Sequence, residues 1–432
     1  MQTLLQAIAK RVKESKKYRF RNLYTMLNTA SLNESWRFMN RKAAPGIDKQ
    51  TVADYEENLG NNISDLVARL KGKRYKAKLV RRVLIPKADG KMRPLGLPVV
   101  EDKLVQLTAA RILSAIYEQD FQKSSYGYRP DLSPRDAVRD MNRELQFGRY
   151  EYIVEADIKG YFDNIDHDWL MKMLEQRIDD RAFLALIRKW LKAGILDTDG
   201  QTIHPASGTP QGGVISPVLA NIYLHYVLDI WFEKVVKPRC RGKVIIYRFA
   251  DDFVCAFEQA EDAERFFKAL PQRLEKFHLN LALDKSRILP FSCFNVVRTS
   301  FDFLGFEFHW GKTRTGKHHL KLRTSRKKLR ASKKNFTAWV RANRHKRLYD
   351  LFAELNSKLR GYYNYYGVIG NLPSLKSFEL HAKRLLFKWL NRRSQRWSYT
   401  WKTFQQMLDI HRIIKASITE QWSSPGQTLL PV

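Results

Sequence analysis

Two short acidic strings hold the side chains best suited to phosphoryl-transfer chemistry. Asp157 lies in residues 155–163, and Asp251 and Asp252 lie together in residues 247–253. Adjacent carboxylates repel one another and destabilise a fold unless a cation neutralises them. Three carboxylates at neighbouring strand ends can hold two Mg²⁺ ions about 4 Å apart, the arrangement used for in-line displacement at phosphorus. The pattern therefore predicts a two-magnesium centre at Asp157, Asp251 and Asp252.

The segments around these acids have the pattern of strands. An apolar run at 152–154 precedes Asp157, and runs at 244–246 and 253–257 enclose the second acidic pair, as in a tight hairpin. An Asp pair alone is also typical of a plain surface turn, because aspartate tolerates turn geometry. Two acidic sites with the same strand context favour the metal centre.

A second group of residues has the chemistry to hold a nucleoside triphosphate. Lys87 and Arg93 flank a turn in a predicted hairpin over 81–96, where an ammonium charge and a planar guanidinium can bind phosphate oxygens. Gln211 and Gly212 lie in a glycine-rich loop before a predicted helix, and glycine lets the backbone approach a ligand closely. A solvent-facing basic hairpin and an ordinary loop before a buried helix are the competing interpretations.

Phe162 and Lys285 complete the candidate site. Phe162, five residues after Asp157, is a candidate for a ring that lies against the sugar of an incoming nucleotide and excludes a 2′-hydroxyl. A core aromatic is the equally weighted alternative. Lys285 is a candidate general acid for the pyrophosphate leaving group. A lysine in a surface turn is the plainer interpretation of that segment alone.

The charge of the chain indicates a polyanionic partner. Its 77 lysine and arginine residues exceed its 44 acidic residues by 33. Residues 311–432 alone contain 27 basic and 5 acidic side chains, and their helical stretches are rich in tryptophan and tyrosine. This imbalance favours nucleic acid, bound in a salt-sensitive manner, over an anionic membrane, since no amphipathic anchor accompanies it.

Hydrophobicity and cysteine content exclude other classes of protein. No apolar run reaches the ~18 residues of a membrane span, and the N-terminal residues lack the basic head and apolar centre of a secretory signal. Three scattered cysteines are too few for a disulfide framework or a zinc site. We expect a reducing, cytoplasmic location of bacterial type.

In this order the motifs resemble those of group II intron-encoded reverse transcriptases, also called maturases. The similarity runs from about residue 20 to 400. Residues 82–96 and 125–130 resemble the fingers motifs, those around Asp157, Gln211 and Asp251 the palm motifs, 279–287 and 301–306 those that follow, and 359–366 and 390–394 the maturase region.

The resemblance implies an α+β fold of the right-hand polymerase type, with fingers, a mixed-sheet palm and a helical thumb. The implied domains are a mostly helical N-terminal extension at 1–80, fingers at 81–150, a palm at 151–312, a basic helical thumb or maturase domain at 313–395 and a short nucleic-acid-binding tail at 396–432.

The resemblance also implies roles for individual residues. The metal ligands would be Asp157, Asp251, Asp252 and the carbonyl of Ile158; the dNTP would contact Lys87, Arg93, Gln211, Gly212 and Phe162; and RNA or DNA would contact Arg129, Arg360, Tyr362, Tyr363, Arg392 and Arg393. Two Mg²⁺ ions are the implied cofactors. The implied partners are structured intron RNA, an RNA template, a DNA primer, dNTPs and target DNA, without a membrane.

The expected function is RNA-dependent DNA synthesis by two-metal nucleotidyl transfer, with binding of intron RNA that promotes splicing and mobility. The family usually has tyrosine at the position of Phe249, so we expect an altered rate or fidelity with activity retained. No cysteine follows Cys293, so we expect no C-terminal HNH-type endonuclease. The alternatives are a splicing maturase with little polymerase activity and a domesticated defence or CRISPR-associated reverse transcriptase.

Overall fold

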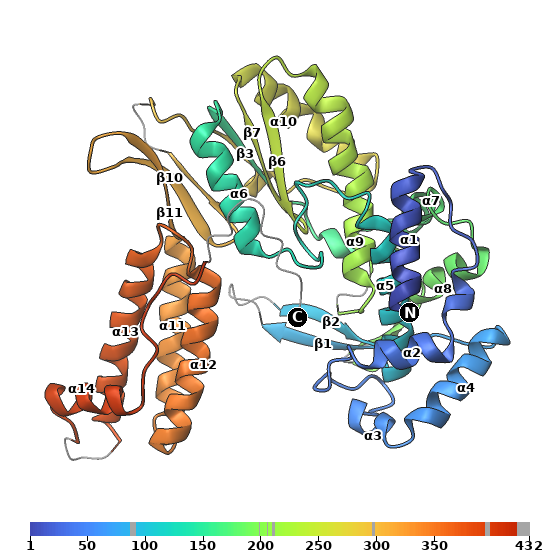
Figure 1. Ribbon diagram of the computed structural model, residues 1–432, viewed down its shortest axis with the longest axis horizontal. Coiled ribbons are helices and arrows are strands. Elements are labelled where there is room, and N and C mark those ends of the chain that lie inside the picture. Colours follow the sequence, from blue (N-terminus) through green and yellow to red (C-terminus); the bar gives the residue numbers. More distant parts are fainter. Residues whose placement is uncertain are drawn as a thin grey trace. The chain divides into compact units, whose positions relative to one another are not determined.

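The structure, a computed structural model, describes residues 1–86, 92–197, 199–204, 206–209, 212–295, 299–393 and 398–420. The chain divides into two compact units. Unit 1 comprises residues 1–132 and 152–288, and unit 2 comprises residues 133–151 and 289–432. Both units combine helices with a sheet (Figure 1), so the fold is mixed α+β.

Helices are the main regular structure of unit 1. In chain order they are α1 (Gln2–Glu14), α2 (Thr29–Trp36), α3 (Val52–Glu56), α4 (Leu59–Lys71), α5 (Val100–Tyr117), α7 (His167–Glu175), α8 (Arg181–Leu191), α9 (Ser216–Leu224) and α10 (Ala260–Glu275). The sequence marks where α7 and α8 begin, because the side chains of Asp166 and Asp180 each accept a hydrogen bond from a first-turn amide. After α9 the chain continues through two π-helical segments, His225–Asp229 and Phe232–Val236.

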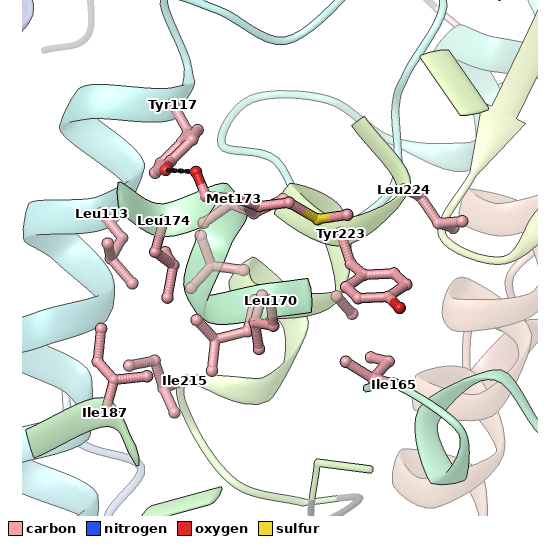
Figure 2. Packing of buried hydrophobic residues seen from close by; sticks show 14 of the residues in the cluster. Leu113, Tyr117, Ile165, Leu170, Met173, Leu174, Ile187, Ile215, Tyr223 and Leu224 are labelled. Atoms are coloured by element: carbon pink, nitrogen blue, oxygen red, sulfur yellow. Dashed lines mark hydrogen bonds between the residues drawn. The ribbon is translucent and has the colours of Figure 1, made fainter. Parts of the chain in front are cut away.

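The core of unit 1 fixes the helices that carry the loops of the candidate site. Figure 2 shows Leu113 and Tyr117 of α5, Leu170 and Met173 of α7, and Tyr223 of α9 packed together, all buried. The Tyr117 hydroxyl donates to the Met173 carbonyl at 3.4 Å. Burial of such apolar surface is the main term that stabilises this packing.

One of the two four-stranded sheets that lie largely in unit 1 has the strand order β6–β7–β3–β8. Its strands are β3 (Tyr152–Ala156), β6 (Val244–Phe249), β7 (Asp252–Phe257) and β8 (Arg287–Pro290). The pairs β6–β7 and β7–β3 are antiparallel. The mixed-sheet palm that the resemblance implies stays a prediction. Helix α10 packs against β3 and β7 (Figure 1).

Parallel pairing occurs in the second sheet of unit 1, whose order is β2–β1–β4–β5. The strands are β1 (Val80–Pro86), β2 (Met92–Leu97), β4 (Ile195–Leu196) and β5 (Thr202–Ile203). The β1–β2 pair is the hairpin predicted over 81–96, which is confirmed, and β1 also pairs in parallel with β4.

Unit 2 contains a three-stranded sheet and five helices among its described residues. They are α6 (Pro134–Phe147), β9 (Ser300–Phe303), β10 (Phe306–Lys312), β11 (His318–Thr324), α11 (Arg326–Asn343), α12 (Leu348–Tyr366), α13 (Leu372–Leu390) and α14 (Trp401–Ile410). The palm–thumb limit expected at 312 falls at the end of β10, whose whole length pairs with β11. The division into fingers, palm and thumb stays a prediction.

No helix among the described residues combines the length and the apolar character needed to cross a membrane.

Candidate active site

The acidic pair lies at the tight turn between β6 and β7. Phe249 pairs with Asp252, so Ala250 and Asp251 form the turn. Ala250 has a left-handed φ of +59°, a conformation that residues with a Cβ atom rarely adopt. A Cβ on Gly127 would lie 2.2 Å from the Ala250 amide nitrogen. Only glycine at position 127 lets the neighbouring loop pack against this turn.

Asp157 reaches the same end of the sheet from β3. Ala156, the last residue of β3, pairs with Phe253. Asp157 therefore lies just after the end of β3, beside the start of β7. The Asp157 carbonyl accepts from the Ala282 amide at 2.8 Å, which fastens β3 to the segment before β8. From that segment Lys285 Nζ reaches Asp157 Oδ2 at 2.8 Å. The structure therefore brings the four predicted catalytic residues to one end of the sheet.

The charges of these groups act on one another. Burial raises the pKa of the Asp251 carboxyl, the negative charge of Asp157 raises it further, and the guanidinium groups of Arg93 and Arg248 oppose the shift. The hydrogen bond and charge of Asp157 raise the pKa of Lys285. A half-buried carboxyl and a second negative charge repel each other, and a bound divalent cation would neutralise that repulsion.

The carboxylates suit Mg²⁺ by chemistry, since hard oxygen ligands are those it prefers. Within the described ranges, no three His, Cys, Asp or Glu side chains form a ready-made metal cage. The positive charge beside Asp157 is the ammonium group of Lys285. Ligation by Asp157, Asp251, Asp252 and the carbonyl of Ile158 stays a prediction.

The residues expected to hold the dNTP are partly described. Arg93 lies on β2, close enough for its charge to act on both Asp251 and Tyr128. Gly212 has a φ of +108°, and a Cβ there would lie 2.6 Å from the carbonyl oxygen of Gly96. Gly212 thus packs on the strand that carries Arg93. Lys87 and Gln211 lie outside the described residues.

Phe162 lies in a 3₁₀ turn that follows β3. Its side chain is mostly buried, and its ring meets that of Tyr128 edge to face, with centroids 6.2 Å apart. The Phe162 carbonyl accepts from the Thr209 amide at 2.8 Å, so the turn is tied to the glycine-rich loop. Its role as a sugar gate stays a prediction.

Sequence reasoning missed Tyr128 and Arg248. Burial and the charge of Asp251 raise the pKa of the Tyr128 hydroxyl, which places this tyrosine beside the acidic turn. Its partner is more than a hundred positions away in sequence, so no local pattern indicated the contact. Arg248 carried a signal that could have found it, since a charged residue inside the apolar strand β6 requires a buried partner.

Two residues expected to contact nucleic acid are packed inside the protein. The Arg129 side chain is 11% exposed and pairs with Glu118 at 2.9 Å, and it also donates to the carbonyls of Gln122 and Ser125. Tyr363 is 1% exposed in the core of unit 2, because it lies on the apolar face of α12. Both side chains are therefore engaged in contacts within the protein.

The other residues expected to contact nucleic acid lie in unit 2. Arg360 and Arg392 are exposed, and Arg393 is half-buried and donates to the Lys346 carbonyl at 3.0 Å. Tyr362 is half-buried, with its ring stacked on Phe378 at a centroid distance of 4.0 Å.

The Trp389 ring is surrounded by cations. The Arg344 guanidinium lies 5.0 Å from its centroid, and Arg341, Lys388 and Arg392 lie 5.8–5.9 Å away. Counting only carboxylates that the structure describes, none of the four forms an ion pair. Cations gathered on an aromatic face without acidic partners are typical of a nucleic-acid surface.

Comparison with known proteins supports the same interpretation. The family model described as reverse transcriptase (RNA-dependent DNA polymerase) matches residues 85–308. The model described as the group II intron, maturase-specific domain matches residues 329–407. The first match alone covers half of the chain and includes every acidic residue of the candidate site.

Similarity to individual proteins agrees with the two family matches. Protein YkfC of Escherichia coli (strain K12) is 33% identical over 304 residues, which are 63% of this chain and 77% of that protein. The group II intron-encoded protein LtrA of Lactococcus lactis subsp. cremoris is 44% identical over 181 residues, which are 42% of this chain but only 29% of LtrA. Nuclear intron maturase 4, mitochondrial, of Arabidopsis thaliana is 27% identical over 130 residues, or 30% of this chain and 16% of that protein. The chain therefore belongs to the group II intron type of the reverse transcriptase family, with a maturase-specific domain after the reverse transcriptase domain.

Proposed function

We propose that the chain is an RNA-dependent DNA polymerase that copies RNA templates into cDNA. The observation that carries the proposal is the meeting of Asp157 with the Asp251–Asp252 turn at one end of the sheet, inside the segment that matches the reverse transcriptase family. In this proposal the β1–β2 hairpin belongs to the fingers, the β6–β7–β3 strands to the palm and helices α11–α13 to the thumb.

The site residues would divide the work of nucleotidyl transfer. Asp157, Asp251, Asp252 and the Ile158 carbonyl would hold two Mg²⁺ ions, which when bound activate the primer 3′-hydroxyl and neutralise the triphosphate. Arg93 would bind phosphate oxygens through its planar fork, together with Lys87, Gln211 and the backbone at Gly212. Phe162 would bound the sugar.

Lys285 would donate a proton to the pyrophosphate leaving group. Its contact with Asp157 raises the pKa of its ammonium group, so Lys285 is charged at neutral pH before a nucleotide arrives. Replacement of that contact by triphosphate oxygens would bring the ammonium proton to the leaving group.

A second function, promotion of intron splicing, is favoured by the maturase-specific match over residues 329–407. The same stretch holds the Trp389 cluster with Arg341, Arg344, Lys388 and Arg392. Together with Arg360 and Tyr362, these side chains would contact structured intron RNA, and the template, primer and target DNA are further proposed partners.

Primer extension on a structured RNA template with dNTPs and Mg²⁺ tests the polymerase proposal. We expect full-length cDNA from the wild-type chain and none from Asp251→Asn, with RNA affinity unchanged because Asp251 contributes no cation to RNA. Synthesis of cDNA by Asp251→Asn would exclude the proposed metal ligands. Absence of product from the wild type, with tight RNA binding, would leave the splicing function alone.

A further inference from the structure

Arg248 is a buried charge in the strand that leads to the acidic turn. It lies in β6, two residues before Ala250, and its side chain is fully buried, as is that of its ion-pair partner Asp229. Two charges removed from water destabilise a fold unless their hydrogen-bond donors and acceptors are satisfied. Replacement of such a pair by apolar residues of similar volume often makes a protein more stable. The presence of this pair beside the acidic turn points to a role beyond filling the core.

All five N–H donors of the guanidinium are used. Nε and Nη2 bind the two carboxylate oxygens of Asp229 at 2.7 and 2.6 Å. Nη2 also donates to Ser125 Oγ at 2.6 Å. Nη1 donates to Asn221 Oδ1 at 3.0 Å and to the Ala250 carbonyl at 2.9 Å. Lysine has three donors on one nitrogen and no planar fork, so it cannot reproduce this arrangement.

These partners enclose the turn. The amide and carbonyl of Arg248 pair with residues 124–126 at 2.9 and 2.8 Å. Asn221, which accepts from the guanidinium, also donates to the Gly127 carbonyl, and Gly127 packs on the backbone of Ala250. The guanidinium thus joins β6, the adjacent loop and α9 around the Ala250 carbonyl.

We propose that Arg248 is a positioning residue for the acidic turn. Its guanidinium fixes the Ala250 carbonyl and so sets the direction in which Asp251 and Asp252 point. Arg248 is fully buried, so it acts on the reaction through the turn. The kinetic test of this role rests on the proposed polymerase function, whereas the metal-binding test does not.

Arg177 provides a matched control in the same unit. Its side chain is 4% exposed and pairs with Asp120 at 2.8 Å, and it donates to the carbonyls of Lys16 and Tyr18. None of these partners belongs to the candidate active site. Arg177→Lys therefore removes a buried guanidinium without touching the acidic turn.

The experiment compares Arg248→Lys, Arg177→Lys and the wild-type chain. Mn²⁺ affinity is measured by electron paramagnetic resonance without nucleotide or RNA, and primer extension with Mg²⁺ gives kcat and KM. We expect Arg248→Lys to weaken Mn²⁺ binding about 10-fold and lower kcat about 100-fold, because a displacement of ~1 Å at a reacting centre has effects of this size. KM for the dNTP should stay near the wild-type value. Arg177→Lys should lower Tm as Arg248→Lys does and leave Mn²⁺ affinity and kcat unchanged.

Ser125→Ala keeps the test decisive if Arg248→Lys does not fold, since it removes one hydrogen-bond acceptor of the Arg248 guanidinium and leaves the ion pair with Asp229 in place. We expect it to weaken Mn²⁺ binding about 5-fold, the equivalent of one hydrogen bond. Wild-type Mn²⁺ affinity in Arg248→Lys, or in Ser125→Ala if the lysine variant is unfolded, would overturn the positioning role. Weakened Mn²⁺ binding, in a chain whose wild type makes no cDNA, would support the positioning role and overturn the polymerase instead. Absence of Mn²⁺ binding by the wild type would overturn both.

Discussion

The three carboxylates of the candidate site differ in their surroundings. Asp251 is half-buried, and its pKa is raised mainly by burial. Asp252 is exposed at the first position of β7. Asp157 is paired with Lys285, whose side chain is 64% exposed. An exposed ammonium on a candidate metal ligand can leave when a better partner arrives, so Lys285 has two separable effects, competition with a cation and proton donation.

These two effects predict opposite changes in Lys285→Met. Because Asp157 loses its ammonium partner, we expect Mn²⁺ to bind more tightly to the variant without nucleotide. Because the leaving group loses a proton donor, we expect kcat to fall at least about 100-fold. Mn²⁺ titration and single-turnover primer extension measure the two effects. Lys159→Met is the control, because it removes an exposed lysine that also lies close to Asp157 in sequence. An unchanged kcat would remove Lys285 from the chemistry.

His225 predicts a pH dependence of stability. It is 3% exposed, and burial lowers its pKa from 6.5 to about 4. The folded state therefore excludes a proton that the unfolded state binds below pH 6.5. The stabilisation from this residue is present above pH 6.5 and is lost as the pH falls to about 4, by about 3 kcal/mol in total.

His225→Phe removes this titration and keeps a ring against Phe121, whose centroid lies 5.5 Å away. Urea unfolding at pH 7 and pH 4 should show that the wild type loses about 3 kcal/mol more than the variant over this range. Equal losses in the two proteins would show that His225 is not buried as a neutral ring.

Among the elements, the hairpin β6–β7 depends on the loop that packs on it. A Cβ at Gly127 meets backbone atoms of Phe249 and Ala250 within 3.0 Å, and backbone does not yield as a flexible side chain does. We expect Gly127→Ala to reduce the free energy of unfolding by about 1–3 kcal/mol and kcat about 100-fold. Chemical denaturation and primer extension measure the two changes.

Gly60→Ala is the control for that substitution. Gly60 lies in α4 with open space where its Cβ would be, so alanine there should stabilise the protein by about 0.5–1 kcal/mol and leave kcat unchanged. Equal kcat values for the two alanine variants would show that the loop does not control the turn.

The strands that carry the site could be predicted from sequence because their signals are local. The apolar runs on both sides of Asp251 correspond to β6 and β7, and the hairpin predicted over 81–96 corresponds to β1 and β2. The parallel partner of β1 could not be predicted, because β4 has only two residues and lies more than a hundred positions away. The same distance problem hid the contact of Arg248 with Ser125.

Side-chain roles were harder to predict than strands. Arg129 and Tyr363 lie in motifs of the right family, yet a motif does not tell which side of the backbone faces the core. Arg129 bonds to Glu118 in unit 1, and Tyr363 lies on the buried face of α12. Lys87 and Gln211 lie outside the described residues, so their positions remain predictions from the motifs alone.

For the molecule as a whole, the distribution of charge favours RNA binding by the basic C-terminal part. Residues 311–432 hold 27 of the 77 lysine and arginine side chains but only 5 of the 44 acidic ones. We expect Arg341→Gln with Arg344→Gln to weaken RNA binding. The slope of log affinity against log salt should fall by about 1.4, since each phosphate contact with single-stranded RNA contributes about 0.7.

Lys237→Gln with Arg239→Gln is the control, because it removes the same charge from an exposed turn of unit 1. Fluorescence anisotropy over a salt series measures both slopes. Equal effects of the two double variants would mean that net charge alone, and not the Trp389 cluster, determines RNA affinity.

Incorporation of a single dNTP on an RNA template, measured by rapid quench in Mg²⁺, is the decisive experiment for the polymerase. The comparison uses the wild type, Asp157→Asn and, as a matched control, Asp168→Asn, whose side chain is 74% exposed on α7. We expect incorporation by the wild type and by Asp168→Asn, and a loss of at least about 1,000-fold in Asp157→Asn, the effect of removing a charged group that stabilises the transition state. Incorporation by Asp157→Asn at the wild-type rate would show that the acidic cluster is not the catalytic centre.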